Sequence, residues 1–170
     1  AALCHERGQA CGFPGGPSYV WEAVDARLVG QVCRWAASEP AAAGQHFNVT
    51  NGDVFEWRNL WPAMMACVGV EAGPDNEISL AEFLPAHARD WDALTRKHDL
   101  RAPPMPALLG ESHHYADFCF AFGMGKPPPP AFVSAIKLRQ AGFTQVMDTQ
   151  DSFCHWLSRL VARRILPDYR

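Results

Sequence analysis

The residues with the clearest chemical potential gather in one aromatic segment near position 114. His113 and His114 are adjacent, and Tyr115 and Phe118 follow them closely. Neighbouring side chains on a helix point about 100° apart, so two adjacent histidines seldom bind one metal ion. No carboxylate or cysteine at ligand spacing completes such a site. The histidine pair is therefore interpreted either as pocket lining or as ordinary packing and surface.

The aromatic side chains of the same segment are compatible with a ligand pocket. Tyr115 and Phe118 share one helical face, which Phe120 and Phe122 cannot also occupy. Aromatic clusters of this kind more often belong to a core. One side of this cluster can nevertheless face a cavity, because apolar pockets with a few polar groups are the usual ligand sites. Asp117, within the segment, is a candidate for a structural ion pair with Arg101 or Lys126.

Catalytic and nucleotide-binding motifs are absent. No Gly-x-Gly-x-x-Gly follows a strand, and there is no Walker loop, Tyr-x-x-x-Lys or Gly-x-Ser-x-Gly. The glycines Gly12, Gly15 and Gly16 are interpreted as part of a turn. No residue is a convincing acid, base or nucleophile on its own merits, so the catalytic residues are unknown from this chain.

Composition places the chain among globular proteins with one hydrophobic core. It has 170 residues, of which 48% are hydrophobic and 19% charged. The formal net charge of −3 argues against nucleic-acid and anionic-membrane partners, which favour clustered cations. No apolar stretch approaches the roughly 20 residues that span a bilayer.

The cysteine spacing does not indicate a disulfide framework. The six cysteines are widely and irregularly spaced, with no Cys-x-x-Cys pair. Several lie in apolar helical stretches, where a thiol behaves as a small buried hydrophobe. We therefore expect neither a disulfide scaffold nor a zinc site, and we expect a reducing, cytoplasmic location.

Hydrophobic periodicity predicts a helix-rich chain with short strands. Helical spacing begins near Asp25 and ends at Pro40, and the cleanest helix ends at Pro167. Short strands are expected at 9–13 and 46–50. A complete doubly wound domain needs at least four or five buried strands, so the fold class is α/β with an incomplete sheet.

Turn and capping residues divide these elements. Asp53 with Glu56 and Ser79 with Glu82 both match the capping box, which predicts two helix starts. Between the aromatic segment and the next helix lies the proline run 127–130. A recognition ligand for a proline-binding module is possible there, but a stiff loop spacer is favoured.

The run Phe47-Asn48-Val49-Thr50-Asn51-Gly52-Asp53-Val54-Phe55-Glu56-Trp57-Arg58-Asn59-Leu60-Trp61-Pro62 carries a family resemblance. It resembles atypical short-chain dehydrogenase/reductases of the progesterone 5β-reductase and iridoid synthase-like family. Further elements of that pattern follow in the same order along the chain. They are Asp25-Ala26-Arg27-Leu28, Trp35-Ala36-Ala37, Trp91, His114-Tyr115-Ala116-Asp117, Ser134-Ala135-Ile136-Lys137, Gly142-Phe143 and Ile165-Leu166-Pro167.

The resemblance implies that residues 1–170 are a single C-terminal, substrate-binding portion of a Rossmann-type extended reductase. An N-terminal Rossmann part with the NADP-binding loop and the catalytic Tyr and Lys would precede Ala1. The complete protein would use NADP(H) to reduce an enone or another activated carbonyl compound, and it is a candidate homodimer. This chain alone would bind no cofactor and have no activity.

The resemblance also suggests substrate-binding residues: Tyr19, His114, Tyr115 and Phe118. Two departures from the family pattern flank that region, a shorter segment at 19–24 and the proline run, so a bulky steroid substrate is not assumed. Two alternatives stay open. One is an epimerase, dehydratase or carbonyl reductase on the same scaffold. The other is a stand-alone binding module with an exposed apolar surface.

Overall fold

The protein forms an elongated, helix-rich molecule with very short strands. The computed structural model describes all residues, 1–170. Its helices are α1 (Ala2–Glu6), α2 (Ala26–Ala36), α3 (Trp57–Cys67), α4 (Leu80–Ala86), α5 (Ala88–Lys97), α6 (Met105–Leu109), α7 (Ser112–Cys119), α8 (Ile136–Gln140) and α9 (Thr149–Ala162), with a 3-10 turn at Pro40–Ala42. The strands are β1 (Cys11–Gly12), β2 (Val20–Trp21), β3 (Phe55–Glu56) and β4 (Ala72–Gly73).

The strands form two separate pairs instead of one sheet. β1 lies parallel to β4, whereas β2 is antiparallel to β3, with Val20 opposite Glu56 and Trp21 opposite Phe55. The expected helix-rich fold with an incomplete sheet is therefore confirmed. None of the helices combines the length and the apolar composition of a membrane-spanning segment.

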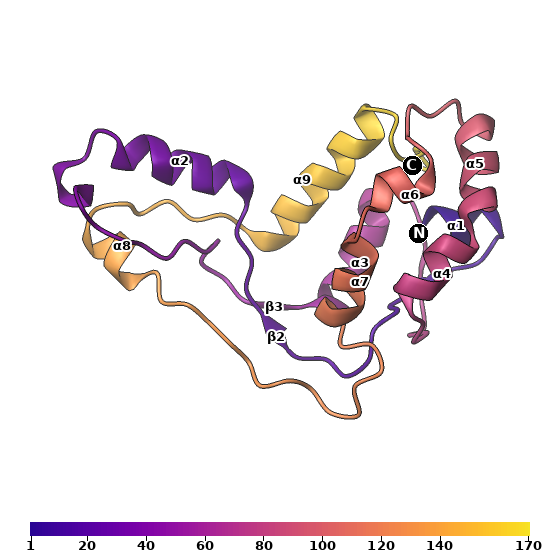
Figure 1. Cartoon of the computed structure of the whole chain (residues 1–170), viewed down its shortest axis with the longest axis horizontal. Coiled ribbons are helices and arrows are strands. Elements are labelled where there is room, and N and C mark those ends of the chain that lie inside the picture. The colour runs from indigo at the N-terminus through magenta and orange to yellow at the C-terminus, as the bar shows by residue number, and fades with distance from the viewer.

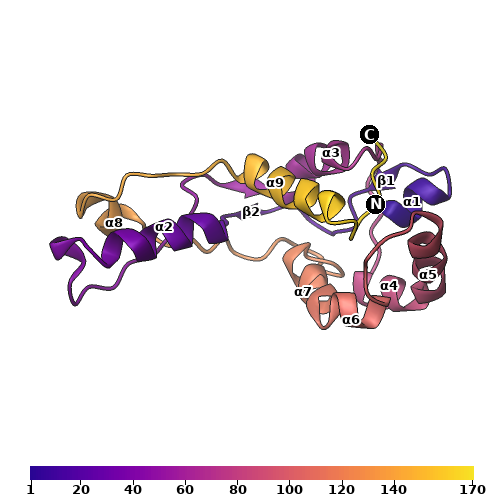
Figure 2. The ribbon, with the colours of Figure 1, turned by 90° about the horizontal axis from the view of Figure 1, so that it is seen from above.

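The helices gather in two groups (Figures 1 and 2). α2 and α8 lie together at one end, α1 and α4–α7 occupy the other, and α9 runs between them beside α3. Three small clusters take the place of one core, and only 26 of 170 residues are buried. Leu28, Val32, Leu138 and Phe143 form the first, Cys11, Met65, Val68, Val70 and Val161 the second, and Leu3, Trp91, Leu94 and Met105 the third.

A buried polar junction joins the start of α2 to the start of α9. Asn51 is 1% exposed, and its side chain accepts a hydrogen bond from the Asp25 backbone N–H (2.7 Å) and donates one to Thr149 Oγ1 (2.9 Å). The Asn51 backbone N–H donates to the carbonyl of Ala23, and its carbonyl accepts from the Met147 N–H. Because a buried polar group without a partner costs about 1–3 kcal/mol, the full set of partners fixes this turn in place.

The Asp25 carboxylate, whose side chain is fully buried, extends the junction to α2 and α9. It accepts hydrogen bonds from the Arg27 backbone N–H and guanidinium (2.7–2.9 Å), which cap and clamp the first turn of α2. Ser152 Oγ and Trp156 Nε1 of α9 donate to its other face. Bonding to Arg27 first, and then to Ser152 and Trp156, holds the Asp25 pKa well below its usual range.

The predicted capping box at Asp53 and Glu56 is wrong. α3 begins after Glu56, whose side chain makes no cap bond and instead accepts from Ser18 Oγ at 2.7 Å. Asp53 caps a different helix, because its carboxylate accepts from the backbone N–H (2.9 Å) and hydroxyl (2.6 Å) of Thr149, at the start of α9. The second predicted helix start is confirmed, since Ser79 Oγ accepts from the Glu82 N–H at 3.1 Å.

Two other local predictions differ from the structure. Residues 46–50 are not paired as a strand, because no neighbouring strand lies beside them. The helix that begins after Ser79 is short, since α4 ends at Ala86 and a second helix, α5, follows after His87.

One disulfide corrects the expectation for the cysteines. Cys67, the last residue of α3, is bonded to Cys154 on α9, with their Cα atoms 5.6 Å apart, while the other four cysteines are free. The partners are 87 residues apart, so only the packing of α3 against α9 brings them together. Disulfides persist mainly in oxidising compartments, so the predicted reducing location gains no support from this bond.

We expect loss of the disulfide to destabilise the fold. Replacing Cys154 with Ser removes the constraint on a long loop of the unfolded chain, which is worth about 2–4 kcal/mol. Urea unfolding followed by circular dichroism measures this difference. The exposed free thiol Cys33 provides the control substitution, Cys33→Ser. Equal midpoints for both variants and the parent would show that the bond contributes nothing.

We also expect Asn51→Ala to lower the free energy of unfolding by about 2 kcal/mol, because Asp25 N–H and Thr149 lose buried partners. Asn59→Ala is the control, since Asn59 is exposed and makes only a 3.4 Å contact with Glu56. Its effect should stay within about 0.5 kcal/mol. Chemical denaturation of both variants tests the junction, and similar losses would contradict its assigned role.

Candidate functional site

Aromatic side chains from β2 and α7 meet on one side of the molecule. The ring centroids of Tyr19 and Trp21 are 5.3 Å apart, and Trp21 stands perpendicular to Phe118 at 6.4 Å. The Tyr19 hydroxyl donates to the carbonyl of Cys119 at 3.2 Å, which ties the β2 segment to the end of α7. Burial raises the pKa of Tyr19, so at neutral pH the residue stays a neutral phenol and does not serve as a base.

These rings border a small apolar hollow of about 130 Å³. Its other wall comes from the chain after α7. The lining residues are Tyr19, Val20, Trp21, Phe118, Pro128, Pro129 and Ala131. No charged side chain is among them, so the hollow suits an uncharged, mainly apolar molecule.

Asp117 holds α7, and with it Phe118, against α4. Its carboxylate accepts hydrogen bonds from Ser79 Oγ (2.7 Å), the Leu80 N–H (2.7 Å) and the Ala81 N–H (3.1 Å). Asp117 therefore caps the N-terminus of α4 from a neighbouring helix, where negative charge is favourable. The ion pair considered for Asp117 with Arg101 or Lys126 is not formed.

The structure brings two of the four predicted binding residues together. Tyr19 and Phe118 line the hollow, whereas His114 and Tyr115 do not. Tyr115 is 64% exposed on the outer face of α7, with its ring 6.0 Å from that of Phe118. The exposed His114 lies 3.6 Å from the Glu111 carboxylate. A role in substrate binding stays a prediction for all four.

Sequence reasoning did not assign the other lining residues to a site. Trp21 lies two residues after Tyr19, and the proline run stands out in the sequence. No local sequence pattern indicates that Trp21 and the prolines line the same hollow. Only the return of the chain after α7 brings Pro128 and Pro129 opposite Trp21.

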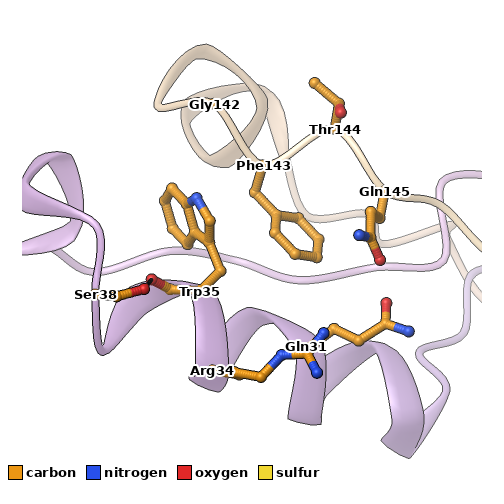
Figure 3. A pocket seen from close by; sticks show the side chains of 8 residues that line it. All are labelled: Gln31, Arg34, Trp35, Ser38, Gly142, Phe143, Thr144 and Gln145. Atoms are coloured by element: carbon orange, nitrogen blue, oxygen red, sulfur yellow. Dashed lines mark hydrogen bonds between the residues drawn. The ribbon is translucent and has the colours of Figure 1, made fainter.

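A second, polar hollow lies between α2 and the loop after α8 (Figure 3). Its volume is about 420 Å³, and its rim carries a guanidinium, two carboxamides and two hydroxyls. The lining residues are Gln31, Arg34, Trp35, Ser38, Gly142, Phe143, Thr144 and Gln145. These groups can hold a polar or anionic molecule, but they include no nucleophile and no acid–base pair.

The chain contains no ready site for a metal or a dinucleotide. No group of three or more His, Cys, Asp or Glu side chains converges. Gly15 and Gly16 serve close packing, since a Cβ atom would lie 2.3 Å from the carbonyl oxygen of Phe120 and 2.4 Å from that of Ala121, respectively. The backbone at these glycines thus faces protein instead of an open phosphate cradle.

No protein-family model matches the chain, but relatives align with nearly all of it. It is 27% identical over 179 residues to an (S)-8-oxocitronellyl enol synthase of Nepeta racemosa, covering 98% of this chain and 42% of that enzyme. It is 27% identical over 175 residues to the 3-oxo-Δ(4,5)-steroid 5β-reductase of Arabidopsis thaliana, again covering 98% and 42%. An enol synthase of Camptotheca acuminata is 30% identical over 152 residues, covering 86% and 36%.

These alignments confirm the resemblance that the motifs predict. The chain is a homologue of the iridoid synthase and progesterone 5β-reductase-like enzymes, and it spans 36–42% of the length of these three relatives.

We expect Asp117→Ala to loosen the wall that Phe118 provides. Loss of the cap on α4 should cost about 1–2 kcal/mol of unfolding free energy and shift the fluorescence of Trp21, which contacts Phe118. Asp92→Ala is a suitable comparison, because no side-chain bond of Asp92 is present. If both variants unfold and fluoresce like the parent, Asp117 does not position α7.

Proposed function

We propose that the chain is the substrate-binding portion of an NAD(P)H-dependent oxidoreductase of the short-chain dehydrogenase/reductase class. The complete protein would reduce an enone or another activated carbonyl compound. One observation carries this proposal: alignment with an enol synthase and a steroid 5β-reductase extends over 98% of the chain. Because the steroid named for the second relative is a 3-oxo-Δ(4,5) compound, its substrate contains a conjugated enone.

In this proposal one part of the complete protein binds the cofactor and carries the catalytic residues, and another part binds the substrate. Gly15 and Gly16 are close-packed against protein backbone, and the chain has no glycine-rich nucleotide motif, so the NADP(H) site and the catalytic Tyr and Lys of the family are assigned to a part outside it. Residues 1–170 would form one substrate-binding unit. Bound NADP(H) supplies the hydride in enzymes of this class.

Exposed apolar side chains support a covering partner for this unit. Trp156 and Leu160 of α9 are 41% and 38% exposed, and Ile136 of α8 is 62% exposed. Large apolar residues exposed on several elements are typical of a surface that another part of a protein covers. We propose the Rossmann part of the same protein for that position.

Within the unit, the aromatic hollow would receive the substrate. Tyr19, Trp21 and Phe118 offer flat apolar surfaces, against which a conjugated carbonyl compound would pack. Their contribution to the reaction is orientation, since the bound molecule must present one carbon to the hydride donor. No proton transfer is assigned to the hollow, since its one ionisable side chain is Tyr19, whose hydroxyl donates to the Cys119 carbonyl.

The test compares two proteins. One is the 170-residue chain, and the other is the complete protein with its nucleotide-binding part. We expect the complete protein to oxidise NADPH when a small enone is present and to yield the saturated carbonyl product, while the chain alone does neither. Turnover by the chain alone would overturn the division of work. An epimerised or dehydrated product from the complete protein would replace reduction with one of the alternative reactions.

A further inference from the structure

Two free cysteines that no other part of the structure uses lie together between α1 and β1. Cys4 is on α1 and Cys11 is in β1, and their side chains are hydrogen-bonded to each other. Cys11 belongs to a buried apolar cluster and is 5% exposed, while the half-buried Cys4 packs against the same cluster. The two sulfur atoms therefore meet in a packed region and not on a mobile surface.

Backbone hydrogen bonds hold both residues of this pair in place. The Gln9 N–H donates to the Cys4 carbonyl at 2.9 Å, so the chain folds back directly after α1. The Cys11 N–H donates to the Glu71 carbonyl at 2.8 Å, and the Cys11 carbonyl accepts from Trp61 Nε1 at 2.9 Å. Because both backbone groups of Cys11 are bonded, its position beside Cys4 is fixed by the fold.

The hydrogen bond between the thiols makes them chemically unequal. The Cys4 S–H donates to the Cys11 sulfur and so stabilises the Cys11 thiolate, which lowers the pKa of Cys11 below its usual range although burial opposes the shift. The same bond, and then burial, raises the pKa of Cys4. The thiolate is the nucleophilic form of cysteine. Cys11 is consequently the attacking sulfur, and Cys4 is the neighbour that keeps its proton.

We propose that Cys4 and Cys11 form a peroxide-reactive dithiol site, which is converted reversibly into an intramolecular disulfide. The Cys11 thiolate attacks one oxygen of hydrogen peroxide, the O–O bond breaks, and a sulfenic acid and hydroxide form. The Cys4 sulfur then attacks the Cys11 sulfur, the S–O bond breaks, and water leaves with the Cys4 proton. The proton that Cys11 released on ionising neutralises the hydroxide. Two thiols are thereby oxidised by two electrons, and one peroxide is reduced to two waters.

The surroundings of the pair favour a small oxidant. Cys11 is almost completely buried, so a compact peroxide reaches it more easily than a bulky disulfide does. Cys33 provides a natural comparison, because it is the exposed free thiol. It lies on α2, at the other end of the molecule from α1 (Figure 1). If exposure alone controlled oxidation, Cys33 would react and the Cys4–Cys11 pair would not.

Peptide mapping of the 170-residue chain tests the site, because trypsin cuts after Arg7 and so separates Cys4 from Cys11. The chain is freed of reductant, treated with one equivalent of hydrogen peroxide, alkylated and then digested without reductant. We expect mass spectrometry to find the peptide that ends at Arg7 joined to peptide 8–27 by a disulfide. Dithiothreitol should separate the two peptides. Peptide 28–34, which contains Cys33, should be recovered alkylated.

The variant Cys4→Ser tests the order of the two steps. Serine keeps a hydroxyl donor beside Cys11 but cannot resolve a sulfenic acid, so that acid should persist on Cys11. Labelling with dimedone, which traps sulfenic acids, should be about tenfold or more stronger at Cys11 in this variant than in the parent. Cys33→Ser is the matched control, and it should form the Cys4–Cys11 disulfide as the parent does.

The proposal is refuted if Cys4 and Cys11 are both recovered alkylated after oxidation, if each pairs with other cysteines as often as with its neighbour, or if Cys33 is oxidised first. Mapping of the parent decides this even if Cys4→Ser does not fold. The readout is covalent and uses neither NADP(H) nor turnover. Failure of the dithiol site therefore leaves the reductase proposal intact, and failure of the reductase assay leaves the dithiol site intact.

Discussion

The arrangement of this protein depends on the hydrogen-bonded junction around Asn51. Asn51, Asp25 and Thr149 are almost completely buried, and the backbone and side-chain polar groups of Asn51 are all hydrogen-bonded. Asp25 caps α2, and Asp53 binds the first residue of α9, so the starts of two helices are fixed at one point. α3 begins shortly after the same turn. The junction therefore sets the directions in which α2, α3 and α9 begin.

The position of the aromatic hollow depends on this junction. β2 ends four residues before Asp25, and β3 begins two residues after Asp53, so the two strands that pair beside the hollow are anchored at the same turn. Small separate apolar clusters then stabilise each end of the molecule. A polar junction suits this role, because its bonds specify directions, whereas apolar contacts mainly specify proximity.

Local sequence signals predict what local forces determine. The apolar spacing of α2 and α9 and the Ser79 cap of α4 follow from neighbouring residues, and the structure has a helix at each place, although α9 ends at Ala162 and not at the predicted Pro167. Asp53 is predicted to cap the helix that follows it, and Asp117 to pair with Arg101 or Lys126, but both carboxylates cap helices that are distant in sequence. Spacing cannot distinguish such a cap from a local one, since the chemistry of the carboxylate is the same in both.

The candidate site was predictable to a similar extent. The family pattern directed attention to Tyr19 and Phe118, which meet, and equally to His114 and Tyr115, which lie on the outer face of α7. Helical periodicity groups Tyr115 with Phe118 but does not reveal how α7 is rotated against α4. The Cys67–Cys154 bond has the same origin, because it depends on the packing of α3 against α9 and not on cysteine spacing.

The disulfide also gives the molecule a covalent topology. Because Cys67 lies before α4 and Cys154 lies in α9, the intervening chain forms a closed ring that contains α7 and the whole proline run. A protease that cuts this ring once, even within the run, leaves a single covalent molecule whose two new ends remain tethered to α3 and α9. Separation into two pieces requires reduction as well as cleavage.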